Sequence, residues 1–334
     1  MIIPKPEQFS GCLIGQCLGD AVGCRVEGFP PDVCQNFVNY EVKIKQIGDR
    51  DRFGLPFGQY TDDSQLAREL IQSYVNCGKF DPSDYAKRIA DLFVENRIVG
   101  RGRATTEAAL RLARGIPWQE AGTPAPSAGN GSAMRAGPIG LIFYKDIKQL
   151  ITAAHNQGRI THQDPRCSAG AVAIAGAVAL VLQNEIIEPD KFLIQLSNWA
   201  GEIDLSVAAS LKDLISWVEL PPEEAVKFIS IAGFAADYKS EWQGISPFVT
   251  PSILWSLYSF LRSPQDYWET ICTSIAVGGD VDTTAAMAGA ISGAYLGLGA
   301  IPDKLARCLS DRGTWGYNNL VELANKCYLL SNIS

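Results

Sequence analysis

The chain has 334 residues, of which 47% are hydrophobic and 19% are charged, a composition that excludes an intrinsically disordered protein. Its net charge of -7 argues against a general nucleic-acid-binding protein, because neutralising phosphates requires a basic surface. The N-terminus lacks the basic flank and apolar core of a signal peptide, and the longest apolar run, residues 169–182, is shorter than a membrane-spanning helix, so we expect no membrane association.

The nine cysteines are an odd number and are scattered without a Cys-x-x-Cys pair. This pattern argues against a disulfide framework and favours reduced thiols that act as small buried apolar groups. We therefore expect a cytoplasmic protein.

Helical periodicity dominates the chain. Apolar residues recur at intervals of three and four, and several such segments begin after Ser, Thr, Asp or Pro. Only residues 42–47 show a brief strand-like alternation. The sequence contains no repeat or linker, so we predict a single compact all-α domain over residues 1–334. The predicted helices span residues 9–23, 64–77, 84–93, 105–113, 168–183, 189–199, 207–217, 222–231, 251–261, 267–277, 283–296 and 302–309.

Two acidic clusters stand where a loop meets a predicted helix. One aspartate suffices to cap the free N–H groups of a helix. Neighbouring aspartates exceed that need and would repel each other without a cation, and carboxylate and hydroxyl oxygens are the ligands that Mg²⁺ prefers. From spacing alone, metal binding and capping with solvated charge are equal alternatives. The clusters contain Thr61, Asp62 and Asp63, and Asp280, Asp282 and Thr283.

Other polar residues lie before and between these clusters. Glu27 follows the first helix, where a lone glutamate is normally a surface residue. Residues 127–135 place glycines on both sides of Asn130, which lets backbone N–H groups face phosphate oxygens, although an ordinary loop explains the pattern as well. The chain has two histidines, too few for a zinc site without cysteines, so we expect His162 to be a capping or hydrogen-bonding residue.

Two further segments have open interpretations. Tyr238, Trp242 and Phe248 would stack on an adenine ring or cover the core equally well. Arg101 and Arg103 are either solvated loop charges or groups that recognise an acidic partner or a phosphate.

Taken together and in this order, the segments resemble the ADP-ribosylglycohydrolase family, particularly its bacterial dinitrogenase-reductase-activating branch. The resemblance covers almost the whole chain, and five collinear motifs are far more specific than any one of them. The residues that carry it are Gly19-Asp20-Ala21-Val22-Gly23 with Glu27, Gly58-Gln59 with Thr61-Asp62-Asp63-Ser64, Gly129-Asn130-Gly131-Ser132-Ala133-Met134-Arg135, Ile160-Thr161-His162, and Gly278-Gly279-Asp280 with Asp282-Thr283-Thr284.

The resemblance implies an all-helical protein with two Mg²⁺ or Mn²⁺ ions in a central cleft, and with Glu27 over the metals. The implied metal ligands come from both acidic clusters, with Thr61, Asp62, Asp63 and Asp282 for one ion and Asp280, Asp282 and Thr283 for the other, so that Asp282 bridges. The implied substrate-binding residues contact diphosphate and ribose, and they are Gly129, Asn130, Gly131, Ser132, Met134 and His162.

The implied activity is hydrolysis of the bond between ADP-ribose and a modified group. Hydrolysis at the anomeric carbon passes through an oxocarbenium-like state and typically uses paired acid and base groups. Glu27 is our first candidate for proton transfer and Asp280 the second. The alternatives are a non-catalytic ADP-ribose-binding homologue and a metal-dependent phosphohydrolase, since acidic clusters also serve phosphate esters.

The resemblance leaves open which linkage is cleaved, and the alternatives are arginine-, serine- and acetyl-linked ADP-ribose and poly(ADP-ribose). Arginine-specific bacterial relatives carry an acid just ahead of the helix near residue 105, where this chain has Arg101 and Arg103. A basic residue there would repel an arginine leaving group, although Glu95 is a possible substitute for the acid.

Overall fold

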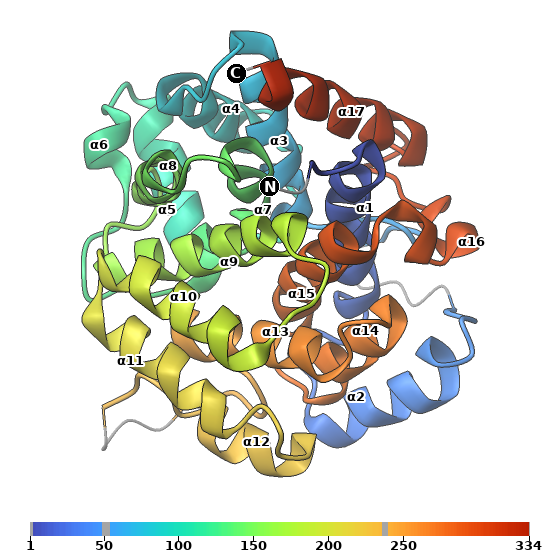
Figure 1. Cartoon of the computed structure of the whole chain (residues 1–334). Coiled ribbons are helices and arrows are strands. Elements are labelled where there is room, and N and C mark those ends of the chain that lie inside the picture. The colour runs from blue at the N-terminus through green and yellow to red at the C-terminus, as the bar shows by residue number, and fades with distance from the viewer. Residues whose placement is uncertain (1–2, 49–53, 236–239, 334) are drawn as a thin grey trace.

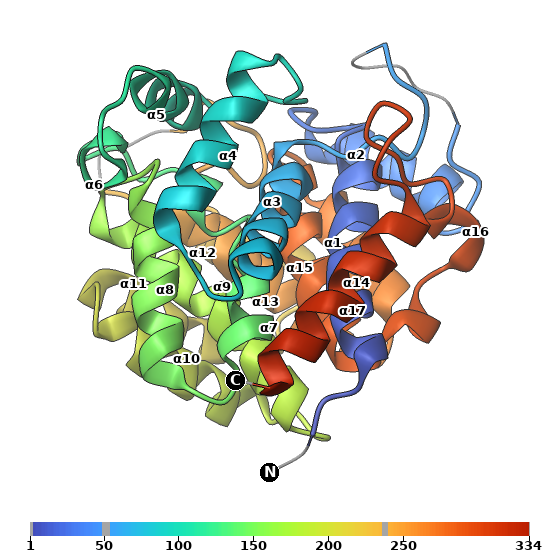
Figure 2. The same ribbon diagram turned by 90° about the horizontal axis from the view of Figure 1, so that it is seen from above.

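Two helices from opposite ends of the chain, α1 (Pro6–Gly23) and α15 (Val281–Leu296), lie side by side at the centre of the molecule (Figure 1). The computed structural model describes residues 3–48, 54–235 and 240–333. Within these residues the chain forms helices and isolated β-bridges but no strand, and the helices make one compact domain (Figure 2). The all-α prediction is confirmed.

Glycines make the close contact of α1 with α15 possible. A Cβ on Gly15 would lie 2.4 Å from the carbonyl oxygen of Gly289, and a Cβ on Gly11 would lie 2.2 Å from that of Gly293. These pairings run in opposite directions along the two helices, which are therefore antiparallel. The end of α1 consequently lies beside the start of α15, where a Cβ on Gly23 would lie 2.5 Å from the Cα of Asp282.

The other helices surround this pair. They are α2 (Pro31–Phe37), α3 (Asp62–Cys77), α4 (Pro82–Val94), α5 (Arg103–Ala113), α6 (Trp118–Ala121), α7 (Gly137–Phe143), α8 (Ile147–Arg159), α9 (Pro165–Gln183), α10 (Pro189–Gly201), α11 (Leu205–Asp213), α12 (Pro222–Ile229), α13 (Val249–Arg262), α14 (Tyr267–Ala276), α16 (Asp303–Ala306) and α17 (Tyr317–Ile333). Short 3-10 turns cover Asn130–Ser132, Leu214–Ser216 and Leu298–Ala300.

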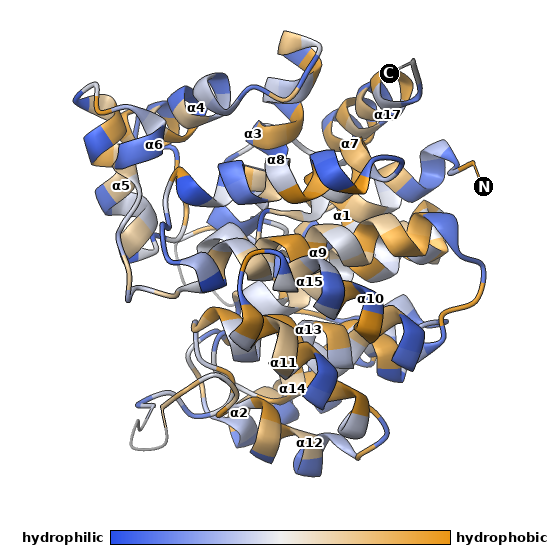
Figure 3. Ribbon diagram, turned by 60° about the vertical axis from the view of Figure 1, so that its left-hand side comes forward, coloured by the Kyte–Doolittle hydropathy of each residue, from blue (hydrophilic) through white to orange (hydrophobic). Residues whose placement is uncertain are grey.

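Helix α9 is strongly apolar and packs against α7, α8, α10, α13 and α15. It is long and apolar enough to cross a membrane, but 83% of its most apolar window is buried inside the molecule. Figure 3 shows this helix and α15 as largely hydrophobic ribbons surrounded by more polar ones. Its composition is therefore explained by its place in the core, as expected for a closely packed central helix.

Several elements differ from the prediction. The strand-like alternation of residues 42–47 is misleading, because Val38–Val42 forms a π-helix and a turn follows it. The structure adds α2, α6, α7, α8 and α17, which the predicted set lacks, and shortens the predicted helix 302–309 to α16. For α8 the sequence does contain a helix-start signal, the aspartate at position 146. Asp146 caps the first turn of this helix by accepting from the Gln149 N–H at 3.0 Å.

Candidate metal and substrate site

The first acidic cluster stands at the start of α3, and a residue of α1 caps this helix. The Asp20 carboxylate accepts from the Thr61 N–H at 3.0 Å, from its hydroxyl at 2.9 Å and from the Ser64 N–H at 3.1 Å. The side chain of Thr61, the N-cap residue, does not itself accept a hydrogen bond from the first turn of the helix. The carboxylates of Asp62 and Asp63 are therefore not needed as caps.

The second acidic cluster is held by backbone bonds to two other loops. Gly279 donates to the Phe29 carbonyl at 3.0 Å and accepts from the Gly28 N–H at 2.8 Å, while the Asp280 N–H donates to Ile245 at 2.8 Å. Gly279 has φ +89, and a Cβ there would lie 2.1 Å from the Ile245 carbonyl oxygen, so glycine is required. These bonds fix Asp280 against the segment that follows Glu27.

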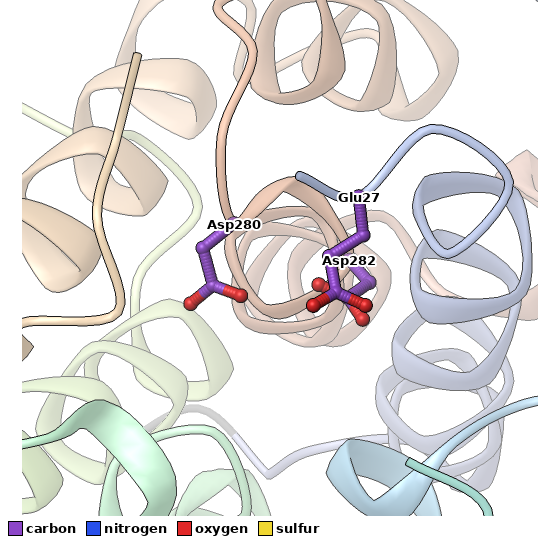
Figure 4. Close-up of side chains that lie close together, drawn as sticks. All are labelled: Glu27, Asp280 and Asp282. Carbon is purple, nitrogen blue, oxygen red and sulfur yellow. The ribbon is translucent and has the colours of Figure 1, made fainter. Parts of the chain in front are cut away.

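The two clusters meet, which spacing alone could not establish. Potential ligand oxygens of Glu27, Asp280 and Asp282 all lie within 4.8 Å of one another (Figure 4). These three carboxylates line one cleft with Asp62, Asp63 and Thr283, and the volume of the cleft is about 610 Å³. Thr61 is buried behind it, and its hydroxyl oxygen lies 3.2 Å from Asp63 Oδ2.

Burial makes the charged state of this cluster costly. The pKa of Asp20, Asp62 and Asp280 is raised to about 7, in each case mainly by burial. Repulsion from Asp20 and then from Glu27 contributes to the shift of Asp62, and repulsion from Glu27 contributes to that of Asp280. The pKa of Asp63 and of Asp282 is raised as well, first by burial and then by neighbouring carboxylates. A cation between these groups would remove the repulsion.

The donor set fits a hard divalent cation. All of its members offer carboxylate or hydroxyl oxygens, which Mg²⁺ and Mn²⁺ accept. Asp63 Oδ1 is buried without a hydrogen-bond partner, an arrangement that costs free energy unless another ligand is present. The geometry therefore favours metal binding over the capping alternative.

The glycine-rich loop reaches the same cleft. The Asn130 amide donates to Asp280 Oδ2 at 2.5 Å and to the Ser252 hydroxyl at 2.9 Å, so it joins this loop to the second cluster. Gly129, Gly131 and Met134 line the cleft with Asn130. Ser132 does not, because its buried hydroxyl donates inward to the Cys167 carbonyl at 2.8 Å.

His162 forms the neighbouring wall of the cleft and is buried. A Cβ on Gly131 would lie 2.7 Å from its Cε1, so the loop needs glycine here. Burial first, and then the positive charge of Arg135, lower the pKa of His162 to about 3 against the opposing effect of Asp164. The imidazole is therefore neutral, and its Nδ1 lies 2.8 Å from the Thr161 hydroxyl. This matches the expected hydrogen-bonding role.

Aromatic rings form another wall of the cleft. Phe234 and Phe248 stack with their centroids 4.5 Å apart, and both line the cleft with Trp242. The Arg166 guanidinium, which donates to Asp164 at 2.7 Å, lies 5.2 Å from the centre of the Phe248 ring. Tyr238, the third aromatic residue considered above, lies outside the described residues.

The basic loop before α5 lies at the edge of the cleft. Arg101 and Arg103 both line it, and Arg103 pairs with Glu107 at 2.9 Å. Glu95 is not at the cleft, because its exposed carboxylate pairs with Arg97 at 2.6 Å. Glu95 therefore does not replace the acid that arginine-specific relatives carry.

Several supporting residues were not predicted. Gln16 on α1 donates to the carbonyls of Asp63 at 3.0 Å and Met134 at 2.9 Å, and so connects the first cluster to the glycine-rich loop. Asp311, near the C-terminus, accepts from Gln65 at 2.9 Å and from Gln59 at 3.2 Å on either side of the first cluster. Gln16 lies three residues before the motif that begins at Gly19, and no local pattern marks either Gln16 or Asp311.

Comparisons with known proteins find relatives in sequence and in fold. The family model for ADP-ribosylglycohydrolase matches residues 4–333. The ADP-ribosylhydrolase ARH3 of Xenopus tropicalis is 32% identical over 329 residues, covering 90% of this chain and 91% of that protein. The ADP-ribosylarginine hydrolase Tri1 of Serratia proteamaculans is 23% identical, covering 92% and 78%. A solved structure described as an ADP-ribosylglycohydrolase-related protein complex superposes with a TM-score of 0.72 at 26% identity over 98% of both chains.

Proposed function

Because the chain belongs to the ADP-ribosylglycohydrolase family, we propose that it hydrolyses the glycosidic bond that joins ADP-ribose to a modified group. The observation that carries this proposal is the bond of Asn130 to Asp280 at 2.5 Å. It joins the glycine-rich loop to the acidic clusters, so a diphosphate and an adjoining ribose would reach both from one position in the cleft.

Two divalent ions, Mg²⁺ or Mn²⁺, would be the cofactors. When bound, they would orient the ribose hydroxyls and lower the pKa of a water molecule. The unpartnered Asp63 Oδ1 and the mutual repulsion of the carboxylates support this assignment. The proposed ligands are Thr61, Asp62, Asp63 and Asp282 for one ion, and Asp280, Asp282 and Thr283 for the other.

Residues of the chain would carry out proton transfer and contact the substrate. Glu27, half-buried at the mouth of the acidic cluster, is the first candidate for proton transfer, and Asp280 is the second. The N–H groups of Gly129 and Gly131 would contact the diphosphate, and the neutral His162 ring would lie against the substrate. The stacked pair of Phe234 and Phe248 offers a surface for the adenine ring.

The direct test incubates the protein with Mg²⁺ and arginine-, serine- or acetyl-linked ADP-ribose and measures free ADP-ribose. We expect Glu27→Gln and Asp282→Asn each to lower kcat by about 10²- to 10⁴-fold, the usual contribution of a proton-transfer group, with Asp282→Asn also weakening metal binding. Matched controls are Glu322→Gln and Asp303→Asn, because both carboxylates are exposed in surface ion pairs and should be neutral.

Other outcomes identify the alternatives. Full hydrolytic rates in both site variants would contradict the proposal. Release of AMP would indicate a phosphohydrolase. Binding of ADP-ribose without release from any conjugate would indicate a non-catalytic homologue.

A further inference from the structure

Asn96, two residues after the end of α4, accepts hydrogen bonds from two arginine side chains, of which Arg101 lines the cleft. Arg312 donates to the Asn96 carbonyl at 2.8 Å and to the Ile98 carbonyl at 3.4 Å. Arg101 donates to the Asn96 side-chain oxygen. Arg312 belongs to the loop before α17, and Figure 2 shows that loop at the same end of the molecule as the loop after α4. We call Arg101 and Arg312 the arginine pair.

The positive charge of the arginine pair is not neutralised within the described part of the chain. The nearby Arg97 and Arg103 have carboxylate partners, Glu95 and Glu107, but no described carboxylate lies within 4.0 Å of the arginine pair. Both side chains are exposed, and each guanidinium has five N–H donors, more than the carbonyl and amide acceptors use. Helix α5 adds the positive end of its dipole, with no acid in its first turn.

The position of the arginine pair defines which part of a substrate would reach it. Arg101 lines the cleft next to Gly100, whose Cβ would lie 2.7 Å from Asp62 Oδ1, whereas Gly129 and Gly131 lie against His162. If the diphosphate lies along the glycine-rich loop, the arginine pair faces the group attached to the ribose. Guanidinium groups bind carboxylates with paired N–H donors, and they repel cationic groups.

We propose that the arginine pair recognises carboxylates of an acidic peptide segment next to the ADP-ribosylated residue. This inference rests on the proposed function and adds a substrate class to it: protein substrates with acidic residues beside the modified side chain. The same charge disfavours cationic surroundings of the modified residue.

The test compares two ADP-ribosylated peptides of equal length, one with Glu and one with Gln beside the modified residue. Exposed ion pairs are weak, so we expect kcat/KM to favour the Glu peptide by about three- to tenfold at low salt. The preference should approach unity near 1 M salt, where the Debye length is about 3 Å.

Variants assign the preference to the arginine pair. The double variant Arg101→Gln/Arg312→Gln should lose the preference, and Arg101→Lys/Arg312→Lys should keep part of it, because the charge is retained without the paired donors. Arg114→Gln is the matched control, because this arginine is exposed at the other end of α5 and should leave the preference unchanged.

Binding and turnover are measured separately. Fluorescence anisotropy of the labelled peptides should give a lower Kd for the Glu peptide, whether or not hydrolysis occurs. Equal Kd values and equal kcat/KM values in the wild-type protein would overturn the inference while leaving the proposed hydrolysis intact. Absence of ADP-ribose release from every conjugate would contradict the proposed function, and the Kd comparison would still decide the role of the arginine pair.

Discussion

Individual carboxylates in the cleft and directly behind it have pKa values far above their ordinary range. Burial raises the pKa of Asp20, Asp62 and Asp280 from 3.8 to about 7. At a pH between these two pKa values, the folded protein without metal binds more protons than the unfolded chain. The free energy of unfolding therefore falls as pH rises from about 4 to about 7, by about 1.4 kcal/mol per pH unit for each such group.

Metal removal should expose this dependence. We expect the Tm of the EDTA-treated protein to fall between pH 5 and pH 8, and the Tm in Mg²⁺ to fall much less, because bound cations offset the carboxylate charge. Differential scanning calorimetry across this range provides the measurement. An Mg²⁺-induced rise in Tm that is the same at pH 5.5 and pH 8 would contradict the assignment of the cluster as a metal site.

His162 gives the opposite pH dependence. Its pKa is about 3 in the folded protein and about 6.5 when unfolded, so the unfolded chain takes up the proton first as pH falls. Relative to His162→Asn, the wild-type protein should lose about 1.4 kcal/mol of stability per pH unit between pH 6 and pH 4. Urea unfolding at several pH values measures this difference, and a constant difference would show that the imidazole titrates normally.

At the scale of single residues, the sequence predicted most of the cleft. Motif residues such as Asp62, Asp282 and Glu27 line it as expected, because loop-to-helix junctions position side chains locally. Ser132 was assigned to the substrate, but its hydroxyl faces Cys167. Asn96 and Arg312 were not identified, since their contact depends on how distant loops pack.

Among the elements, the α1–α15 contact determines the geometry of the site. Gly15→Ala would place a Cβ 2.4 Å from the Gly289 carbonyl oxygen, and backbone there has no room to move without separating the helices. We expect a loss of about 1–3 kcal/mol or more in the free energy of unfolding, and weaker Mn²⁺ binding because Glu27 moves away from Asp282. Calorimetry and Mn²⁺ titration measure the two effects.

The control for this variant is Gly299→Ala, where an added Cβ meets nothing within 4 Å. Gly299→Ala should change neither the free energy of unfolding nor the affinity for Mn²⁺ appreciably. If Gly15→Ala matches the control in stability and in Mn²⁺ affinity, the close helix contact does not position the site.

The helices themselves were largely predictable, because apolar periodicity and Asp caps act within a few residues. Helix α17 shows what was missed: its buried Leu320, Leu323, Ala324 and Cys327 follow a helical spacing that was present in the sequence. Residues 42–47 show the limit of short patterns, since their strand-like alternation accompanies the end of a π-helix and a turn.

For the whole molecule, the sequence predicted the fold class but not the meeting of the clusters. Contacts such as Gly279 with Phe29 and Asn130 with Asp280 join segments far apart in the chain, and no local pattern specifies them. The collinear motifs indicated a shared site only through the family resemblance. The structure supplies the physical reason, which is the antiparallel central pair.

The same long-range packing leads to a prediction about unfolding. Since α1 packs on both α15 and α17, the first and last parts of the chain should unfold together. We expect a single calorimetric transition, with equal calorimetric and van't Hoff enthalpies, and a shift of that whole transition in Mg²⁺. Two separate transitions, only one of them sensitive to Mg²⁺, would contradict this expectation.

The pairing of α1 with α15 also has a consequence for biosynthesis. Glu27 and Asp62 leave the ribosome early, whereas Asp280 and Asp282 follow only when most of the chain has been made. A nascent or prematurely terminated chain that ends before α15 carries one acidic cluster without its partner. If the two clusters bind metal ions as proposed, such a chain lacks Asp280, Asp282 and Thr283 and should neither bind the metal ions as the full-length chain does nor hydrolyse the substrate.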